Sequence, residues 1–95
     1  MALGYQSATL GQSSITLGAN VTSGAFDEVV VGSYNSLPAN LNGTSWVATD
    51  PIFVVGNGTT ASTRSDAVTV LKNGAVLVHP SGDLQMGNYI AGPQP

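Results

Sequence analysis

The sequence ALGYQSATLGQSSITLGAN, residues 2–20, repeats a Leu-Gly pair every seven residues. The pairs are Leu3-Gly4, Leu10-Gly11 and Leu17-Gly18. A seven-residue period is typical of coiled coils, but a glycine inside a helix costs about 1 kcal/mol relative to alanine. The repeat also lacks the charged residues that flank a coiled-coil seam. The repeat therefore excludes a helix and requires another explanation.

The residues that precede each glycine alternate between apolar and polar side chains. The pattern is visible in Ala8–Gly11 and Ile15–Gly18, and Val29–Gly32 provides a further copy. A period of two is the geometry of a β-strand, and Thr, Val and Ile favour strands. We therefore predict strands of about four residues, each followed by a turn. The turn glycines of this first part are Gly4, Gly11, Gly18 and Gly32.

Two strands and two turns in fourteen residues predict one coil of a β-solenoid. The side chains expected to point inward, and so to form the repeat core, are Leu10, Ile15, Leu17, Val29 and Val31. Such a core is thin, so we expect oligomerisation to bury a second face. Ser23-Gly24-Ala25 lacks the apolar pair of the other units, which leaves the path of residues 19–28 open.

The second half of the chain predicts further strands separated by turn signals. We expect strands at 45–48, 52–55, 67–71, 75–79 and 84–86, with a polar loop over 56–66. Asn73-Gly74 is a strong hairpin signal, which makes Gly74 another turn glycine. No helix is predicted.

The composition restricts the classes of protein and partner. Of the 95 residues, 7% are charged and 42% are hydrophobic, whereas about 25% are charged in an ordinary domain. The chain should therefore fold rather than remain disordered. Arg64 and Lys72 are its only basic residues, which argues against nucleic acid as a partner. The apolar runs are too short for membrane insertion, and the lack of cysteine excludes disulfides.

The polar residues do not form a recognisable catalytic or metal-binding motif. His79 is the only histidine, and a triad with Ser81 and Asp83 in one turn would rarely have the required geometry. The adjacent Asp27 and Glu28 are interpreted as a solvated turn, since Ca²⁺ needs six or more oxygen ligands. We therefore expect no enzymatic activity, no metal and no cofactor.

Two further groups of residues could contact a ligand or another chain. Arg64 and Asp66 are opposite charges close in sequence, and they form either an exposed pair or an ion pair between chains. Trp46 and Tyr34 are candidate ligand contacts, although aromatic side chains more often pack in cores or interfaces.

The first third of the chain resembles the head repeats of trimeric autotransporter adhesins, the YadA-like heads. The segments SATLGQSSITLG and FDEVVVGSYNS carry the resemblance, which implies a left-handed parallel β-roll over residues 1–36 in a homotrimer. After a connecting loop at 37–50, residues 51–95 resemble a segment of bacterial surface proteins and phage-type tail fibres. That second resemblance implies a hairpin-rich, trimeric segment such as a β-prism.

The resemblance implies an all-β structural and adhesive segment of an extracellular fibre, on a bacterial surface or a phage-type particle. Two alternatives remain open: a receptor-binding or spacer module of a tail fibre, and a glycan-binding head. Ice binding ranks last, because the outward threonine row is short and irregular. The expected partners are two further copies of the chain, and a host-surface glycan or protein.

Overall fold

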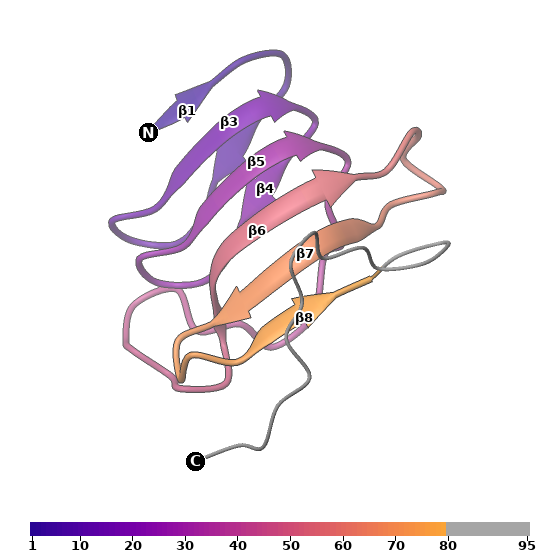
Figure 1. The fold of residues 1–95 in the computed structure, drawn as a ribbon. Coiled ribbons are helices and arrows are strands. Elements are labelled where there is room, and N and C mark those ends of the chain that lie inside the picture. Colours follow the sequence, from indigo (N-terminus) through magenta and orange to yellow (C-terminus); the bar gives the residue numbers. More distant parts are fainter. Residues whose placement is uncertain (80–95) are drawn as a thin grey trace, which may run out of the picture.

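The computed structural model describes residues 1–79, which form eight strands and no helix (Figure 1). None of the described residues therefore belongs to a helix long and apolar enough to cross a membrane. The predicted strand at 84–86 and the tail lie outside the described residues. The strands are β1 (Ala2–Leu3), β2 (Ala8–Thr9), β3 (Ile15–Ala19), β4 (Thr22–Ser23), β5 (Val29–Ser33), β6 (Pro51–Asn57), β7 (Asp66–Leu71) and β8 (Val76–Val78).

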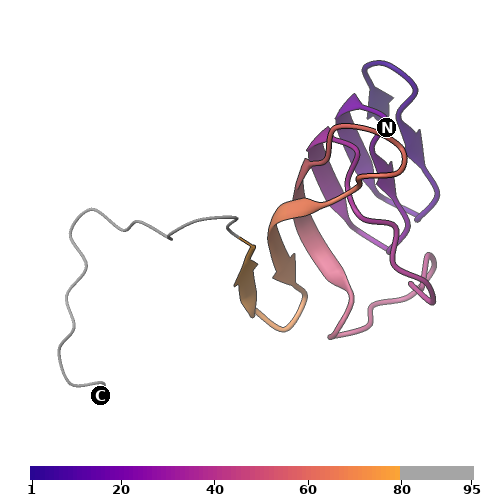
Figure 2. The ribbon, with the colours of Figure 1, turned by 90° about the vertical axis from the view of Figure 1, so that its right-hand side faces the viewer.

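The first strands pair in parallel with partners fourteen residues apart in sequence. Ala2 of β1 lies beside Thr16 of β3, and Thr16 lies beside Val30 of β5. The same spacing pairs Ala8 of β2 with Thr22 of β4 in a separate two-stranded sheet. In Figure 1, β4 lies behind β3 and β5, and Figure 2 shows the same elements from the side. The predicted fourteen-residue spacing is therefore confirmed, and it continues through residues 19–28.

The spacing changes between β5 and β6, because residues 34–50 form a long loop. Gly32 lies beside Gly56, so this parallel pair is separated by twenty-four residues. The antiparallel strands β7 and β8 then complete one six-stranded sheet in the order β1-β3-β5-β6-β7-β8. The hairpin at Asn73-Gly74 is confirmed, with Gly74 at φ 93°. The strand predicted at 45–48 is wrong, because these residues lie in the long loop.

The repeating glycines are needed because backbone segments fourteen residues apart approach one another closely. A Cβ atom on Gly18 would lie 2.0 Å from the carbonyl oxygen of Gly32, and Gly4 stands in the same relation to Gly18. Both residues also have positive φ, at 129° for Gly4 and 136° for Gly18. Gly11 is similarly close to the carbonyl oxygen of Ala25. Ala25 can carry its methyl group because the loop interrupts the fourteen-residue spacing before another strand would pair at this position.

A second seven-residue periodicity occurs in the backbone of the turns. Five residues that are not glycine have φ between 40° and 58°, and consecutive members are seven residues apart. They are Gln6, Ser13, Asn20, Asp27 and Tyr34. Each lies two residues after a position of the seven-residue glycine repeat. The positive φ occurs even at Asp27, where Ala25 stands in place of the glycine. Three of the five are neither Asn nor Asp, the residues that favour this conformation most strongly after glycine. The positive φ of these turn residues could therefore not be predicted from the sequence.

The buried positions have the opposite parity from the predicted core. Val21, Val30 and Val54 form the apolar cluster, with Thr16 and Ser23 also fully buried. Because neighbouring residues of a strand point to opposite faces, burial of Val30 places Val29 and Val31 on the outer face. The prediction of an inward core is therefore wrong for Leu10, Ile15, Leu17, Val29 and Val31. Leu10 is 73% exposed and Leu17 is 38% exposed, while the other three are half-buried.

Candidate functional site

The outer face of the six-stranded sheet carries two continuous rows of apolar side chains. The strand register places the members of each row side by side on successive strands. One row is Leu3, Leu17, Val31, Val55, Val68 and Val78, and the other is Ile15, Val29, Phe53, Val70 and Val76. We call these eleven residues the outer sheet face. Across six strands spaced by about 4.8 Å, it extends for about 24 Å.

Much of the outer sheet face is accessible to solvent in the single chain. Leu17 and Phe53 are each 38% exposed, and Val76 near the other end is 60% exposed. None of its eleven members is charged or polar, and each row is unbroken from strand to strand. Contiguous exposed apolar surfaces of this kind mark interaction sites in soluble proteins. Four of the five residues predicted to fill the inner core, all except Leu10, thus contribute to a surface that a partner could cover.

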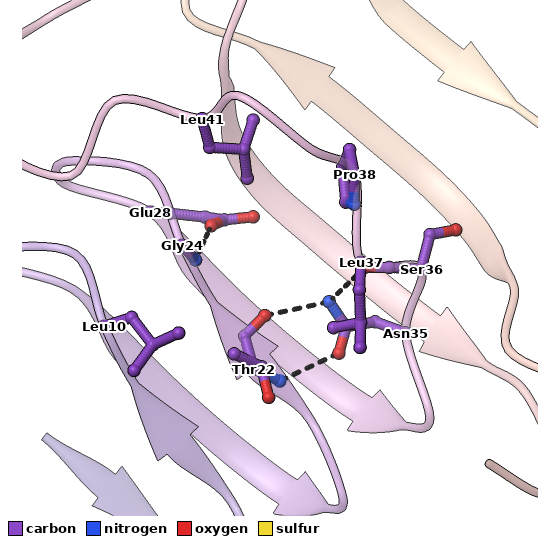
Figure 3. Close-up of a pocket in the computed structure, with 9 residues that line it drawn as sticks. All are labelled: Leu10, Thr22, Gly24, Glu28, Asn35, Ser36, Leu37, Pro38 and Leu41. Atoms are coloured by element: carbon purple, nitrogen blue, oxygen red, sulfur yellow. Dashed lines mark hydrogen bonds between the residues drawn. The ribbon is translucent and has the colours of Figure 1, made fainter.

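A pocket of about 170 Å³ lies at the edge of the two-stranded sheet (Figure 3). Its apolar walls consist of Leu10, which follows β2, and of Leu37, Pro38 and Leu41 from the long loop. Its polar lining includes Glu28 and Asn35, each 2% exposed. The interpretation of Asp27 and Glu28 as a solvated turn is therefore wrong for Glu28. The sequence offered no signal for this burial, since the two acidic residues stand in a polar turn.

The side chains of Glu28 and Asn35 form hydrogen bonds with backbone groups at the edge of the two-stranded sheet, where the repeat is interrupted. A continued fourteen-residue spacing would place the strand containing Ser36 beside Thr22. Instead, the Asn35 side chain accepts from the Thr22 N–H and donates to the Thr22 carbonyl oxygen, both at 2.9 Å. Glu28 Oε1 accepts from the N–H groups of Gly24 and Ala25, at 2.9 and 3.0 Å. Two side chains thereby replace the hydrogen bonds of a missing strand, one of the ways a sheet edge can be covered.

The environment of Glu28 affects its ionisation. Burial raises the pKa of its carboxyl group, while the hydrogen bonds from Ala25 and Gly24 and the positive charge of Lys72 act in the opposite direction. Burial has the largest effect, so the pKa is raised from its usual value of 4.5. Among the described residues, no donor contacts the second carboxylate oxygen, and no cation pairs with this group.

Arg64 and Asp66 are not paired with one another within the described chain. The Arg64 guanidinium donates to the carbonyl oxygens of Asn20 and Asn35, and lies 5.4 Å from the centre of the Tyr34 ring. Asp66 accepts from the Ser36 N–H at 2.8 Å. Both charged residues therefore hold the start of the long loop, and Tyr34 is a packing partner of Arg64. The ion pair between chains remains a prediction.

Trp46 lies in the long loop and is 53% exposed. The Lys72 ammonium lies 5.4 Å from the centre of its ring and donates to the Pro51 carbonyl oxygen at 2.8 Å. Lysine thus occupies one face of the indole in a cation–π contact. The candidate ligand contacts Trp46 and Tyr34 each pack against a cation of the same chain, and the structure does not bring them together.

The described residues contain no group of three His, Asp or Glu side chains that could hold a metal ion. His79 lies at the exposed end of the sheet, and its backbone N–H donates to the Ala67 carbonyl oxygen. A second hollow beside it is lined by Ser36, Arg64, Ser65 and Asp66. Ser81 and Asp83, the other two residues considered for a triad, lie outside the described residues.

Comparison of the chain with protein-family models, curated proteins and solved structures finds no match. The arguments for function therefore rest on the outer sheet face and the pocket.

Proposed function

We propose that this chain is a structural and adhesive segment of a homotrimeric extracellular fibre. In this proposal, residues 1–36 are coils of a left-handed parallel β-roll, and the strands that follow continue the same sheet as a β-prism. The observation that carries the proposal is the outer sheet face, with its two unbroken apolar rows. A lone chain would leave this surface in water, whereas other copies of the chain can cover it.

The arrangement in two rows supports a cyclic trimer. In a cyclic assembly of three subunits, each subunit uses two different patches to contact its two neighbours. The two rows lie two residues apart along each strand, a distance of about 7 Å. Three sheets facing a common axis can therefore pack one row of each subunit against the other row of the next. An interface of this kind would run the length of the sheet and be largely apolar, as obligate interfaces are.

The large share of apolar residues also supports burial of a second face. The inner positions Val21, Val30 and Val54 use only a few of the apolar residues in a chain that is 42% hydrophobic. A trimer would bury the outer residues as well, and would produce a stiff rod with three identical sides. Three identical sides convert weak single contacts into avid attachment, which suits an adhesive fibre.

The test is the oligomeric state of the whole chain and of two matched variants. We expect sedimentation equilibrium to give three times the chain mass of 9.6 kDa. Leu17→Lys places a charge on the outer sheet face, on β3, and should yield monomers or aggregates. Leu10→Lys makes the same change in the equivalent Leu-Gly unit but on the other sheet, and should remain trimeric. A monomeric wild-type chain at concentrations of tens of micromolar would overturn the proposal.

A further inference from the structure

The pocket at the edge of the two-stranded sheet combines an apolar wall with one buried carboxylate. Leu10, Leu37, Pro38 and Leu41 line the pocket, and the Glu28 side chain lies among them (Figure 3). Oε1 of Glu28 is held by the two backbone N–H groups of Gly24 and Ala25. In Figure 3, the other oxygen points toward the space beside Pro38 and Leu37. The pocket therefore presents one negatively charged hydrogen-bond acceptor, held in a fixed position between apolar walls.

The Asn35 amide in the lining of the pocket is already satisfied. The Asn35 amide nitrogen donates to the carbonyl oxygens of Thr22 and Ser36, and its oxygen accepts from the Thr22 N–H. Besides the hydroxyl groups of Thr22 and Ser36, an incoming ligand would thus meet one free charged atom, the second oxygen of Glu28. The apolar walls and the single charged oxygen favour an apolar stem that ends in a charged donor.

The cations of the described residues are engaged elsewhere. The Arg64 guanidinium bonds to the Asn20 and Asn35 carbonyl oxygens, and Lys72 Nζ bonds to the Pro51 carbonyl oxygen. These are the only arginine and lysine side chains in the sequence, and the amino terminus donates to the Ser14 carbonyl oxygen. A cation that neutralises Glu28 would therefore come from another molecule.

We propose that this pocket binds the ammonium end of a lysine side chain from a partner protein. The ammonium group would donate to the free oxygen of Glu28, and the four methylenes would lie along Leu10, Leu37 and Leu41. A volume of about 170 Å³ is sufficient for such a stem, since a cavity of about 150 Å³ accommodates benzene. The charge is complementary as well, because the chain carries a formal −3. The pocket belongs to the two-stranded sheet, so it stays available whether or not the outer sheet face is covered.

The first test uses the wild-type chain and a series of small probes, followed by amide NMR shifts of Gly24 and Ala25. We expect saturable shifts with n-butylammonium, at least tenfold weaker binding of methylammonium, and no saturation with n-butanol at the same concentrations. Nα-acetyl-lysine N-methylamide should bind like n-butylammonium, and its Nε-acetylated form should not. Equal responses to n-butylammonium and n-butanol would overturn the assignment of charge. Binding of n-butylammonium without binding of the blocked lysine would overturn lysine as the ligand.

The second test uses two variants that remove the same charge at adjacent positions. Glu28→Gln keeps a carbonyl oxygen for the Gly24 and Ala25 N–H groups but removes the negative charge, and should weaken n-butylammonium at least tenfold. Asp27→Asn makes the same change in net charge outside the pocket lining and should bind as the wild type does. Asparagine also suits the positive φ of 58° at this position. Equal affinity of Glu28→Gln and wild type would overturn the proposal, and the probe series still decides if Glu28→Gln does not fold.

Discussion

Substitution of Gly18 by alanine tests whether close packing between neighbouring strands explains the repeated glycines. The new Cβ atom would lie 2.0 Å from the Gly32 carbonyl oxygen, well inside van der Waals contact. This neighbour is backbone, so relief of the clash requires β3 and β5 to separate locally. The position also has φ 136°, which residues with a side chain rarely adopt.

The expected loss of stability can be estimated from these two effects. An L-residue held in a sparsely populated backbone region costs about 1–3 kcal/mol. Separation of the strands would weaken one or two backbone hydrogen bonds, each with a net contribution of about 1 kcal/mol. Gly18→Ala should therefore destabilise the fold by about 2–5 kcal/mol, a large fraction of the stability of a small domain.

Gly74 provides the matched control, because nothing lies within 4 Å of the position that its Cβ would occupy. Its φ of 93° is also positive, so Gly74→Ala reports the backbone strain without the clash and should cost about 1–2 kcal/mol. Both variants would be unfolded in guanidinium chloride and followed by circular dichroism at one protein concentration, since an oligomer's stability depends on concentration. If Gly18→Ala is no less stable than Gly74→Ala, close packing does not explain the repeat.

Three further changes have expected outcomes that follow from the surroundings of individual side chains. Thr16→Val should stabilise the fold by about 1 kcal/mol in denaturant unfolding, because the fully buried Thr16 hydroxyl has no hydrogen-bond partner among the described residues and the paired Val30 already occupies the equivalent position; a loss of stability would show that the hydroxyl has a partner. Arg64→Ala should destabilise the fold by about 1–2 kcal/mol through loss of two carbonyl contacts and the Tyr34 contact, and Arg64→Lys should restore part of this; a melting temperature equal to that of the wild type would refute these contacts. Because the Glu28 pKa is raised in the folded state, that state binds this proton more readily than the unfolded state, so the contribution of Glu28 to stability should improve as the pH falls from 7 toward 4.5. The difference in unfolding free energy between wild type and Glu28→Gln should shift in favour of the wild type over this range, and a constant difference would contradict the assigned burial.

The sequence predicted those features of the fold that depend on local spacing. The fourteen-residue parallel register, the strands near Ile15 and Val29, and the hairpin at Asn73-Gly74 all follow from the periodicity of glycine and apolar residues. It did not predict how Ser23-Gly24-Ala25 continues the repeat. The glycine is dispensable at Ala25 because no further strand pairs there, and this depends on a loop that begins nine residues later.

The pocket could not be predicted from local patterns. Glu28 and Asn35 are ordinary turn residues in the sequence, and they are buried because no further strand pairs with the edge of the two-stranded sheet. The next strand is missing there because residues 34–50 leave the fourteen-residue spacing, which is a property of the whole chain. Arg64 likewise reaches Asn20, forty-four residues away, and no charge pattern near Arg64 indicates this contact.

The error in the predicted core has a simple physical origin. Alternation shows that a strand has two unlike faces, but it does not show which face points inward when both carry apolar residues. In β5 three valines are consecutive, so either parity would bury a valine. In β3 the threonine is inside and its hydroxyl has no partner there, while Ile15 and Leu17 lie on the outer face. A chain that places threonine inside and leucine outside is arranged unfavourably for a monomer. The arrangement is favourable if the larger side chains fill the space between subunits, and for this reason we expect the variant Leu17→Lys to disrupt assembly while Thr16→Val only stabilises the subunit.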